Sequence, residues 1–365
     1  MPGLMLGGAG GAGGAGGAGG AGGAGGAGGA GGAMLGTMGD AYANPVMINA
    51  LILAREGTTV PDTACYAKNL PTIGKEVALE RWEPWVRAYT AVGELLRGVE
   101  FNLSGKGFQV YASAATNVIA KIERPAEATF QKQTALVVYW SELRYERAVE
   151  ILAQIDPQYA FWSSILYMHP DRSKRTFELI NIVLQFCVHV EMQFKHALAC
   201  WRPVEYNAQV QPMITTPGHG SFPSGHSTQA HAVAYVLQRL LKLTLANYPS
   251  VIDQLDRQAA RIATNRVVAG VHFPVDSMAG RMLGVALGEY VAGRCGQPQM
   301  FMERTFLTAT LDASCPSTDF NPFDPNQQLS GGAFYSEKAG SVVNPSALLT
   351  YFWDRAQEEW TDHFP

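Results

Sequence analysis

The chain has 365 residues, of which 47% are hydrophobic and 16% are charged, and its formal net charge at pH 7 is −4. This near-neutral balance, with no block of lysine and arginine, argues against a protein that binds nucleic acid through its phosphates. No apolar stretch reaches the length of about 18 residues that a membrane-spanning helix needs, so we expect no membrane span.

Residues 7–33 consist of nine Gly-Gly-Ala triplets. Glycine loses the most backbone entropy on folding and alanine offers little apolar surface, so this tract cannot form a packed core. We predict a disordered, low-complexity head over residues 1–37 and a single folded domain over residues 38–365. Because the head resembles no signal peptide and the five cysteines form no CxxC pair, we expect a cytoplasmic protein with reduced thiols.

Helical periodicity dominates the rest of the chain. Apolar residues recur at spacings of three and four over residues 77–97, 131–154, 173–199, 227–245, 251–268 and 275–292. Strand signals are weak, and the best lies over residues 107–113. The tail after Gly296 is rich in Pro, Asn, Asp and Ser, although residues 346–359 can form a last helix. The pattern predicts an all-α fold with its active-site core over residues 173–293.

Three glycines, Gly280, Gly284 and Gly288, recur at a spacing of four in the last of the core helices. In an apolar helix this spacing is typical of membrane dimers. Here Arg281 and Glu289 interrupt the apolar surface, so the pattern predicts close packing against a neighbouring helix of the bundle.

The first segment with candidate functional residues is the end of the helix predicted over residues 173–199. Lys195 and Arg202 are seven residues apart, which is two helical turns, so both side chains can project from one face. Pro203 then ends the helix. A lysine and an arginine at this place often only complement the helix dipole, so this segment alone is weak evidence of function.

The second segment is the loop from Pro217 to Ser227, which is rich in glycine, proline and serine and leads into an apolar helix. A helix N-terminus offers unpaired N–H groups and a positive dipole end, which suit an oxyanion. Ser224 adds a hydroxyl donor, and His226 adds an acid–base group. An ordinary helix cap with a solvated histidine explains this segment equally well.

The third segment runs from Asn265 to Asp276. His272 and Asp276 are four residues apart, so the carboxylate can accept a hydrogen bond from one imidazole nitrogen. The other nitrogen then keeps a lone pair and can act as a nucleophile or a metal ligand. A solvated His–Asp pair is the alternative. Taken with Arg266, however, the three segments supply the cations, amide and hydroxyl donors that bind a tetrahedral oxyanion.

The pattern K-x6-R-P at 195–203, P-S-G-H at 223–226 and R-x5-H-x3-D at 266–276 resembles the three-part signature of the PAP2-type phosphatase and vanadium-dependent haloperoxidase superfamily. One departure is Asn265, where the family usually has serine. The resemblance implies a helical bundle whose bound phosphate or vanadate (orthovanadate) is held by Lys195, Arg202, Ser224, Gly225 and Arg266.

The resemblance implies one of two activities. In a haloperoxidase, His272 binds the vanadium of the cofactor and His226 assists the activation of hydrogen peroxide, which oxidises halide to a hypohalous species. In a phosphatase, His272 attacks phosphorus to form a phosphohistidine, Asp276 orients it, and His226 protonates the leaving alcohol. His219, seven residues before His226, is typical of enzymes that oxidise bromide or iodide.

The haloperoxidase is favoured because a long helical sequence precedes Lys195 and because residues 140–152 resemble bacterial vanadium haloperoxidase-like proteins. We therefore expect hydrogen peroxide, halide and a small organic acceptor as reactants, and a homo-oligomer, a dimer or larger, without nucleic-acid partners. A non-catalytic scaffold with the same fold is a further alternative, but the matched polar positions are all intact.

Overall fold

The computed structural model describes residues 45–60, 69–112, 118–155, 158–296, 299–314 and 318–363. The head predicted over residues 1–37 lies outside these ranges. The α-helices of the described residues are α5 (Pro45–Thr58), α6 (Pro84–Leu96), α7 (Glu127–Trp140), α8 (Arg144–Ala153), α9 (Tyr159–Leu166), α10 (Lys174–Leu198), α11 (Pro203–Tyr206), α12 (Gly225–Leu240), α13 (Pro249–Val268), α14 (Pro274–Cys295), α15 (Ala309–Ser314) and α16 (Ala347–Gln357).

The prediction of an all-α fold is wrong, because the chain also forms a five-stranded mixed sheet. Its strands are β1 (Val99–Ser104), β2 (Gly107–Ala112), β3 (Val118–Glu123), β4 (Gln299–Phe306) and β5 (Tyr335–Val343), in that spatial order. Strands β3 and β4 are parallel, and every other neighbouring pair is antiparallel. The edge strand β5 exposes most of its side chains, so it lacks the apolar alternation that marks a strand in sequence.

The predicted strand at residues 107–113 corresponds to β2, the most deeply buried of the first three strands. A two-residue turn joins β1 to β2, and Ser104 pairs with Gly107 across it. Gly105 occupies the first central position of this turn with φ +61°, a left-handed conformation that glycine adopts at little cost.

Four of the predicted helices are confirmed: α10, α12, α13 and α14. The two predicted earlier in the chain are interrupted. Residues 77–97 break before Pro84, which lacks the N–H needed inside a helix and instead begins α6. Residues 131–154 divide into α7 and α8 around a short 3-10 helix at Ser141–Leu143. The last helix expected over residues 346–359 is confirmed as α16.

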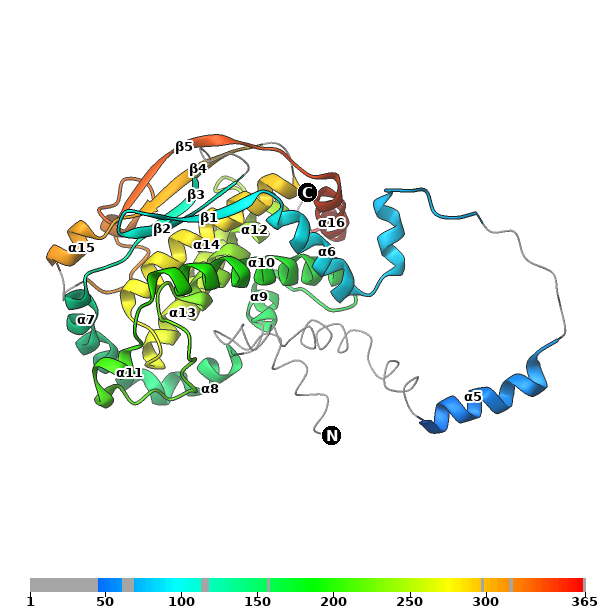
Figure 1. Ribbon diagram of the computed structural model, residues 1–365, viewed down its shortest axis with the longest axis horizontal. Helices are drawn as coiled ribbons and strands as arrows, with labels where there is room; N and C mark the ends of the chain where they lie inside the picture. Colours follow the sequence, from blue (N-terminus) through cyan, green and yellow to red (C-terminus); the bar gives the residue numbers. More distant parts are fainter. Residues whose placement is uncertain are drawn as a thin grey trace.

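The sheet lies along one side of the long helices α10, α12 and α14, while α7, α8 and α11 lie toward the other side of the body (Figure 1). Buried residues of the sheet and of these long helices belong to one hydrophobic cluster. Within the described ranges, no helix has the length and apolar character that a membrane span requires. Cys187, Cys200 and Cys295 are free and buried, whereas Cys65 and Cys315 lie outside the described residues.

The glycines of α14 face α12, which confirms the predicted close packing. A Cβ atom at Gly280 would lie 2.6 Å from Ser224 O, and one at Gly288 would lie 3.0 Å from Ala232 O. At Gly284 a Cβ atom would collide with the carbonyl oxygen of Thr228. The two backbones therefore approach closely, and this approach sets the N-termini of α12 and α14 side by side.

Candidate functional site

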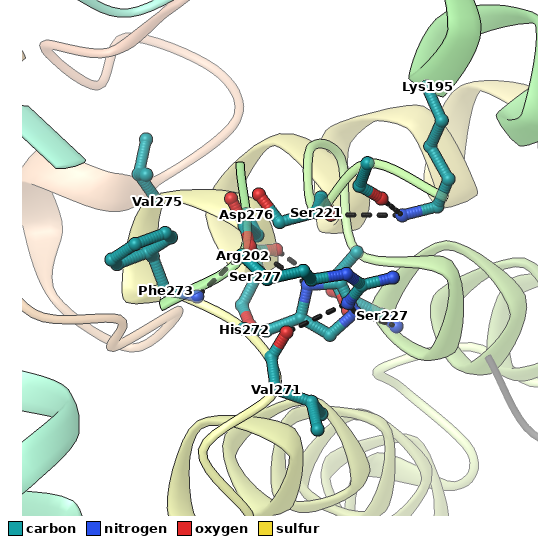
Figure 2. Close-up of polar contacts among 12 residues, drawn as sticks. Lys195, Arg202, Ser221, Ser227, Val271, His272, Phe273, Val275, Asp276 and Ser277 are labelled. Atoms are coloured by element: carbon teal, nitrogen blue, oxygen red, sulfur yellow. Dashed lines mark hydrogen bonds and ion pairs between the residues drawn. The ribbon is translucent and has the colours of Figure 1, made fainter. Parts of the chain in front are cut away.

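The three predicted segments meet at the adjoining ends of four helices. Lys195 comes from the last turn of α10, His226 from the start of α12, Arg266 from the last turn of α13, and Asp276 from the first turn of α14. The side chains brought together are all buried, each at most 2% exposed: Lys195, Arg202, Ser224, His226, Arg266, His272 and Asp276. Figure 2 shows Arg202, His272 and Asp276 in contact, with Lys195 reaching in from one side.

His272 is held between a carboxylate and a guanidinium. Its Nδ1 lies 2.8 Å from Asp276 Oδ2, which also accepts a hydrogen bond of 2.9 Å from the Phe273 backbone N–H. Its Nε2 lies 3.1 Å from Nη1 of Arg202. A guanidinium can only donate, so Nε2 must accept, and the imidazole proton is on Nδ1. The arrangement therefore keeps the lone pair of His272 on Nε2.

Burial controls the protonation of this pair. It lowers the pKa of His272 well below its usual value, and the nearby charges of Arg202 and Lys195 lower it further. It raises the pKa of the Asp276 carboxyl to about 7, against the opposing effect of the Phe273 N–H and the two cations. The imidazole of His272 is thus neutral at neutral pH, as a nucleophile or metal ligand must be.

Arg202 reaches the site from outside α10, so the expectation that Lys195 and Arg202 project from one helix face is wrong. The helix ends at Leu198 because Ala199 turns left-handed, with φ 47°. Arg202 follows in extended backbone ahead of α11. Its Nε donates to the carbonyl of His219 at 3.0 Å, and its Nη2 lies 3.0 Å from Nδ1 of the same histidine. Arg202 therefore connects His272 to half-buried His219.

Lys195 holds the loop that leads to α12. Its Nζ donates to the carbonyl oxygens of Gly220 at 3.1 Å and Ser221 at 2.9 Å. Burial lowers the pKa of Lys195 to about 7, and the positive charge of Arg202 lowers it as well. A bound anion would oppose both effects and keep the ammonium group charged.

The N-terminus of α12 carries the predicted hydroxyl and amide donors. Ser224 caps the helix, and its Oγ accepts a hydrogen bond from the backbone N–H of Ser227. The first hydrogen bond within the helix runs from Thr228 N to Ser224 O at 3.0 Å. The backbone N–H groups of Gly225 and His226 lie ahead of it and therefore have no partner within the helix. The backbone N–H of Ser224 donates to the carbonyl of Asp276 at 2.9 Å, which joins this helix end to that of α14.

His226 has one occupied and one free ring nitrogen. Its Nε2 lies 3.0 Å from the carbonyl oxygen of Gln154, which can only accept, so Nε2 carries the proton. Its Nδ1 is buried and has no hydrogen-bond partner among the described residues. Burial and the charge of Arg266 lower the pKa of His226 well below its usual value. The free nitrogen of His226 is therefore a proton acceptor.

Arg266 is a buried cation with spare donors. Its Nη2 donates to the carbonyl of Ile151 at 3.0 Å and to Oε1 of Gln154 at 3.1 Å. Its Nε and Nη1 are buried, and no group of the described chain accepts from them. Burial lowers the pKa of Arg266 to about 9. An anion that accepted from both atoms would remove this imbalance.

The sequence did not identify two residues that contact the site, Gln154 and Glu191. Glu191 lies one turn before Lys195, and a Cβ atom on Gly225 would lie 2.6 Å from its Oε1, so a side chain at position 225 would collide with it. Burial raises the pKa of Glu191 to about 7. A carboxylate within the apolar run of α10 was a usable signal for Glu191. No sequence signal marks Gln154, whose contacts with Asn265, Arg266 and His226 are made only when the chain folds.

A sequence model of the PAP2 superfamily matches residues 177–293. This segment of the chain is thus similar to the PAP2 superfamily. The match spans the segment from α10 to α14 that supplies Lys195, His226, Arg266 and Asp276. The superfamily includes vanadium haloperoxidases and PAP2 phosphatases, so the match leaves the reaction open. No curated protein sequence matches the chain.

Proposed function

We propose that this PAP2-superfamily chain is a vanadate-dependent haloperoxidase that oxidises bromide or iodide with hydrogen peroxide. The hypohalous product would then halogenate small organic acceptors. The binding part of the proposal is supported by Arg266, whose Nε and Nη1 are buried without an acceptor in the described chain. Lys195 and Arg202 add two further buried cations. A tetrahedral oxyanion is the ligand that such a donor set accommodates.

The donor set fits vanadate. Lys195, Arg202, Arg266, Ser224 and the Gly225 amide would hold its oxygens, and Nε2 of His272 would bind the metal. When bound, vanadate supplies a Lewis-acidic centre that activates hydrogen peroxide toward halide.

Two residues prepare His272 for this role. Asp276 keeps the imidazole proton on Nδ1, so that Nε2 retains its lone pair. Arg202 donates to that lone pair through Nη1, and this contact has to break when Nε2 takes a ligand. The released N–H of Arg202 is then free to donate to the anion that replaces it.

The choice of a peroxidase over a phosphatase rests on His226. Its proton is on Nε2, bonded to the carbonyl oxygen of Gln154, so Nδ1 keeps a lone pair and can accept a proton rather than donate one. Activation of hydrogen peroxide needs a group that takes a proton from it, and Nδ1 can do so. Hydrolysis of a phosphomonoester needs the reverse, because the leaving alcohol must receive a proton. The resting state of His226 therefore supports the peroxidase.

Two further observations support the proposal that the reactants are small and that the oxidised halide is bromide or iodide. Apart from His219, the polar side chains of the site are at most 2% exposed, which favours reactants of the size of hydrogen peroxide and halide. His219 is half-buried, and its ring contacts Arg202. It is therefore part of the site and not a solvated loop histidine. It is thereby placed to influence which halide is oxidised.

Reconstitution tests this proposal. Protein loaded with orthovanadate is expected to brominate a phenolic dye with hydrogen peroxide and bromide, whereas unloaded protein is not. Elemental analysis should find vanadium in the loaded protein and little in His272→Ala, the matched variant without the metal ligand. Absence of bromination by vanadium-containing protein, together with hydrolysis of p-nitrophenyl phosphate by unloaded protein, would assign the phosphatase instead.

A further inference from the structure

Gln154 lies just beyond α8, outside the segment that matches the PAP2 superfamily, and its side chain is fully buried. Its Oε1 accepts from Nδ2 of Asn265 at 2.9 Å and from Nη2 of Arg266 at 3.1 Å. Its backbone carbonyl accepts from Nε2 of His226 at 3.0 Å. One residue thus contacts three members of the site, two through its amide and one through its backbone.

We propose that Gln154 is a positioning residue of the oxyanion site, which fixes Arg266 through a neutral acceptor and so preserves the positive charge that binds the anion. The inference rests on the anion-binding part of the proposed function, which a haloperoxidase and a phosphatase share. It does not depend on which of the two reactions follows.

The orientation of the Gln154 amide is determined by its other neighbour. Its Nε2 donates to Oε1 of Glu150 at 3.0 Å, and a carboxylate can only accept. The amide oxygen must therefore face Asn265 and Arg266. The carboxylate of Glu150 itself pairs with Arg261, at 2.8 and 2.7 Å from Nε and Nη2, and does not hydrogen-bond to Arg266 within the described residues.

The neutrality of the amide is the property that matters. An amide oxygen binds Nη2 of Arg266 without forming an ion pair, and Nε and Nη1 stay unpaired within the described residues. A carboxylate in the same place would form a buried ion pair with Arg266 and would repel an incoming anion. Glu150 lies only one turn away, but among the described residues it pairs with Arg261 and acts on Arg266 only through its charge.

Asn265 belongs to the same arrangement. It stands where the superfamily usually has serine, and its amide bridges two residues: Nδ2 donates to Gln154, and Oδ1 accepts from Nη1 of Arg147 at 3.0 Å. The longer asparagine side chain therefore gives Gln154 a second donor beside Arg266. This contact holds the amide oxygen in place without adding charge.

A charge swap tests the inference. The double variant Glu150→Gln, Gln154→Glu keeps the composition and net charge but moves the carboxylate one helical turn, to the side of Arg266. Orthovanadate and inorganic phosphate binding to the full chain are measured by calorimetry, and thermal unfolding is recorded without anion. We expect the Kd for both anions to rise by about 10- to 100-fold, the usual effect of an altered outer partner. The swap also removes the Glu150–Arg261 ion pair, so the melting temperature without anion is compared with that of the single variant Glu150→Gln, and it should be kept or raised because Arg266 gains an ion pair.

The single variant Glu150→Gln is the matched control. Its introduced amide oxygen can still accept from Nε2 of Gln154, so its anion affinity should stay near that of the unchanged chain. A purely structural role for Gln154 predicts a lower melting temperature with unchanged affinity in the folded double variant, and that result would overturn the inference. Lack of halide oxidation by unchanged protein that binds both anions would refute the proposed haloperoxidase and leave this inference standing.

Discussion

Two residues of the site, Arg266 and His226, carry buried polar atoms that lower the stability of the fold and are available to a ligand. Among the described residues, Nε and Nη1 of Arg266 and Nδ1 of His226 are buried without a partner. Each such atom costs about 1–3 kcal/mol, because it has lost its water and gained no hydrogen bond. An anion that accepts from Arg266 recovers part of this cost. The arrangement is therefore more stable with a bound anion than without one.

The titrating residues of the site predict that anion affinity falls as pH rises above about 7. Burial lowers the pKa of Lys195 to about 7 and raises those of Glu191 and Asp276 to about 7. Raising the pH through this value removes a positive charge from Lys195 and adds negative charge to the two carboxyls, so all three changes weaken anion binding. Sulfate binding, measured by calorimetry between about pH 6 and pH 9, checks this prediction, because the charge of sulfate does not change there.

Lys195→Arg is the control for the pH series. Its guanidinium stays charged over the whole range, so only Glu191 and Asp276 still titrate and the decline should be shallower. A Kd for sulfate that stays constant across the range in the unchanged chain would contradict the prediction. It would mean that Lys195 keeps its proton and that both carboxyls keep one charge state.

At the scale of elements, the site helices follow from sequence and the sheet does not. Apolar spacing and the prolines that begin α13 and α14 identify these helices locally. Strand β4 is different, because it forms its parallel pairing with β3, some 180 positions earlier (Ala120 pairs with Arg304), and no local pattern records such a partner. For the same reason Gln154 escaped prediction, whereas the motifs around Lys195, His226 and His272 did not.

The contact between α12 and α14 predicts the effect of a single methyl group. In Gly284→Ala the added Cβ would collide with the Thr228 carbonyl, and backbone cannot move aside without separating the helices. We expect a loss of about 1–3 kcal/mol in the free energy of unfolding, measured by urea titration. Anion affinity should fall as well, since the Ser224–Asp276 backbone bond depends on this approach.

Gly93→Ala is the matched control for the helix contact. Gly93 lies inside α6, and nothing lies within 4 Å of the position of its missing Cβ. The change should therefore stabilise the protein by about 0.5–1 kcal/mol, because alanine favours a helix over glycine. Equal stability of Gly284→Ala and Gly93→Ala would show that the two helices tolerate a wider separation than the structure indicates.

At the scale of the whole molecule, the segments on either side of the residues that match the PAP2 superfamily meet each other. Strand β3 precedes the matched residues 177–293 and β4 follows them, and their pairing places one continuous sheet against the core helices. The C-terminal segment also contacts the start of α10. Oxygens of Glu359 accept from the backbone N–H groups of Arg175 at 2.8 Å and Thr176 at 2.9 Å, while Trp360 donates to the Thr176 hydroxyl at 2.8 Å.

This last contact predicts a loss of stability without a loss of binding. Glu359 satisfies two N–H groups that α10 leaves unpaired at its N-terminus, so Glu359→Ala should lower the free energy of unfolding by about 1–2 kcal/mol. Lys195 lies near the opposite end of the same helix, about 30 Å away at 1.5 Å per residue, so phosphate affinity of the folded variant should not change. Urea unfolding and calorimetry measure the two quantities on one preparation. Glu359→Gln, which keeps one acceptor oxygen, should fall between the two proteins in stability. A weaker phosphate Kd in folded Glu359→Ala would instead mean that the C-terminal segment sets the position of α10 along its whole length.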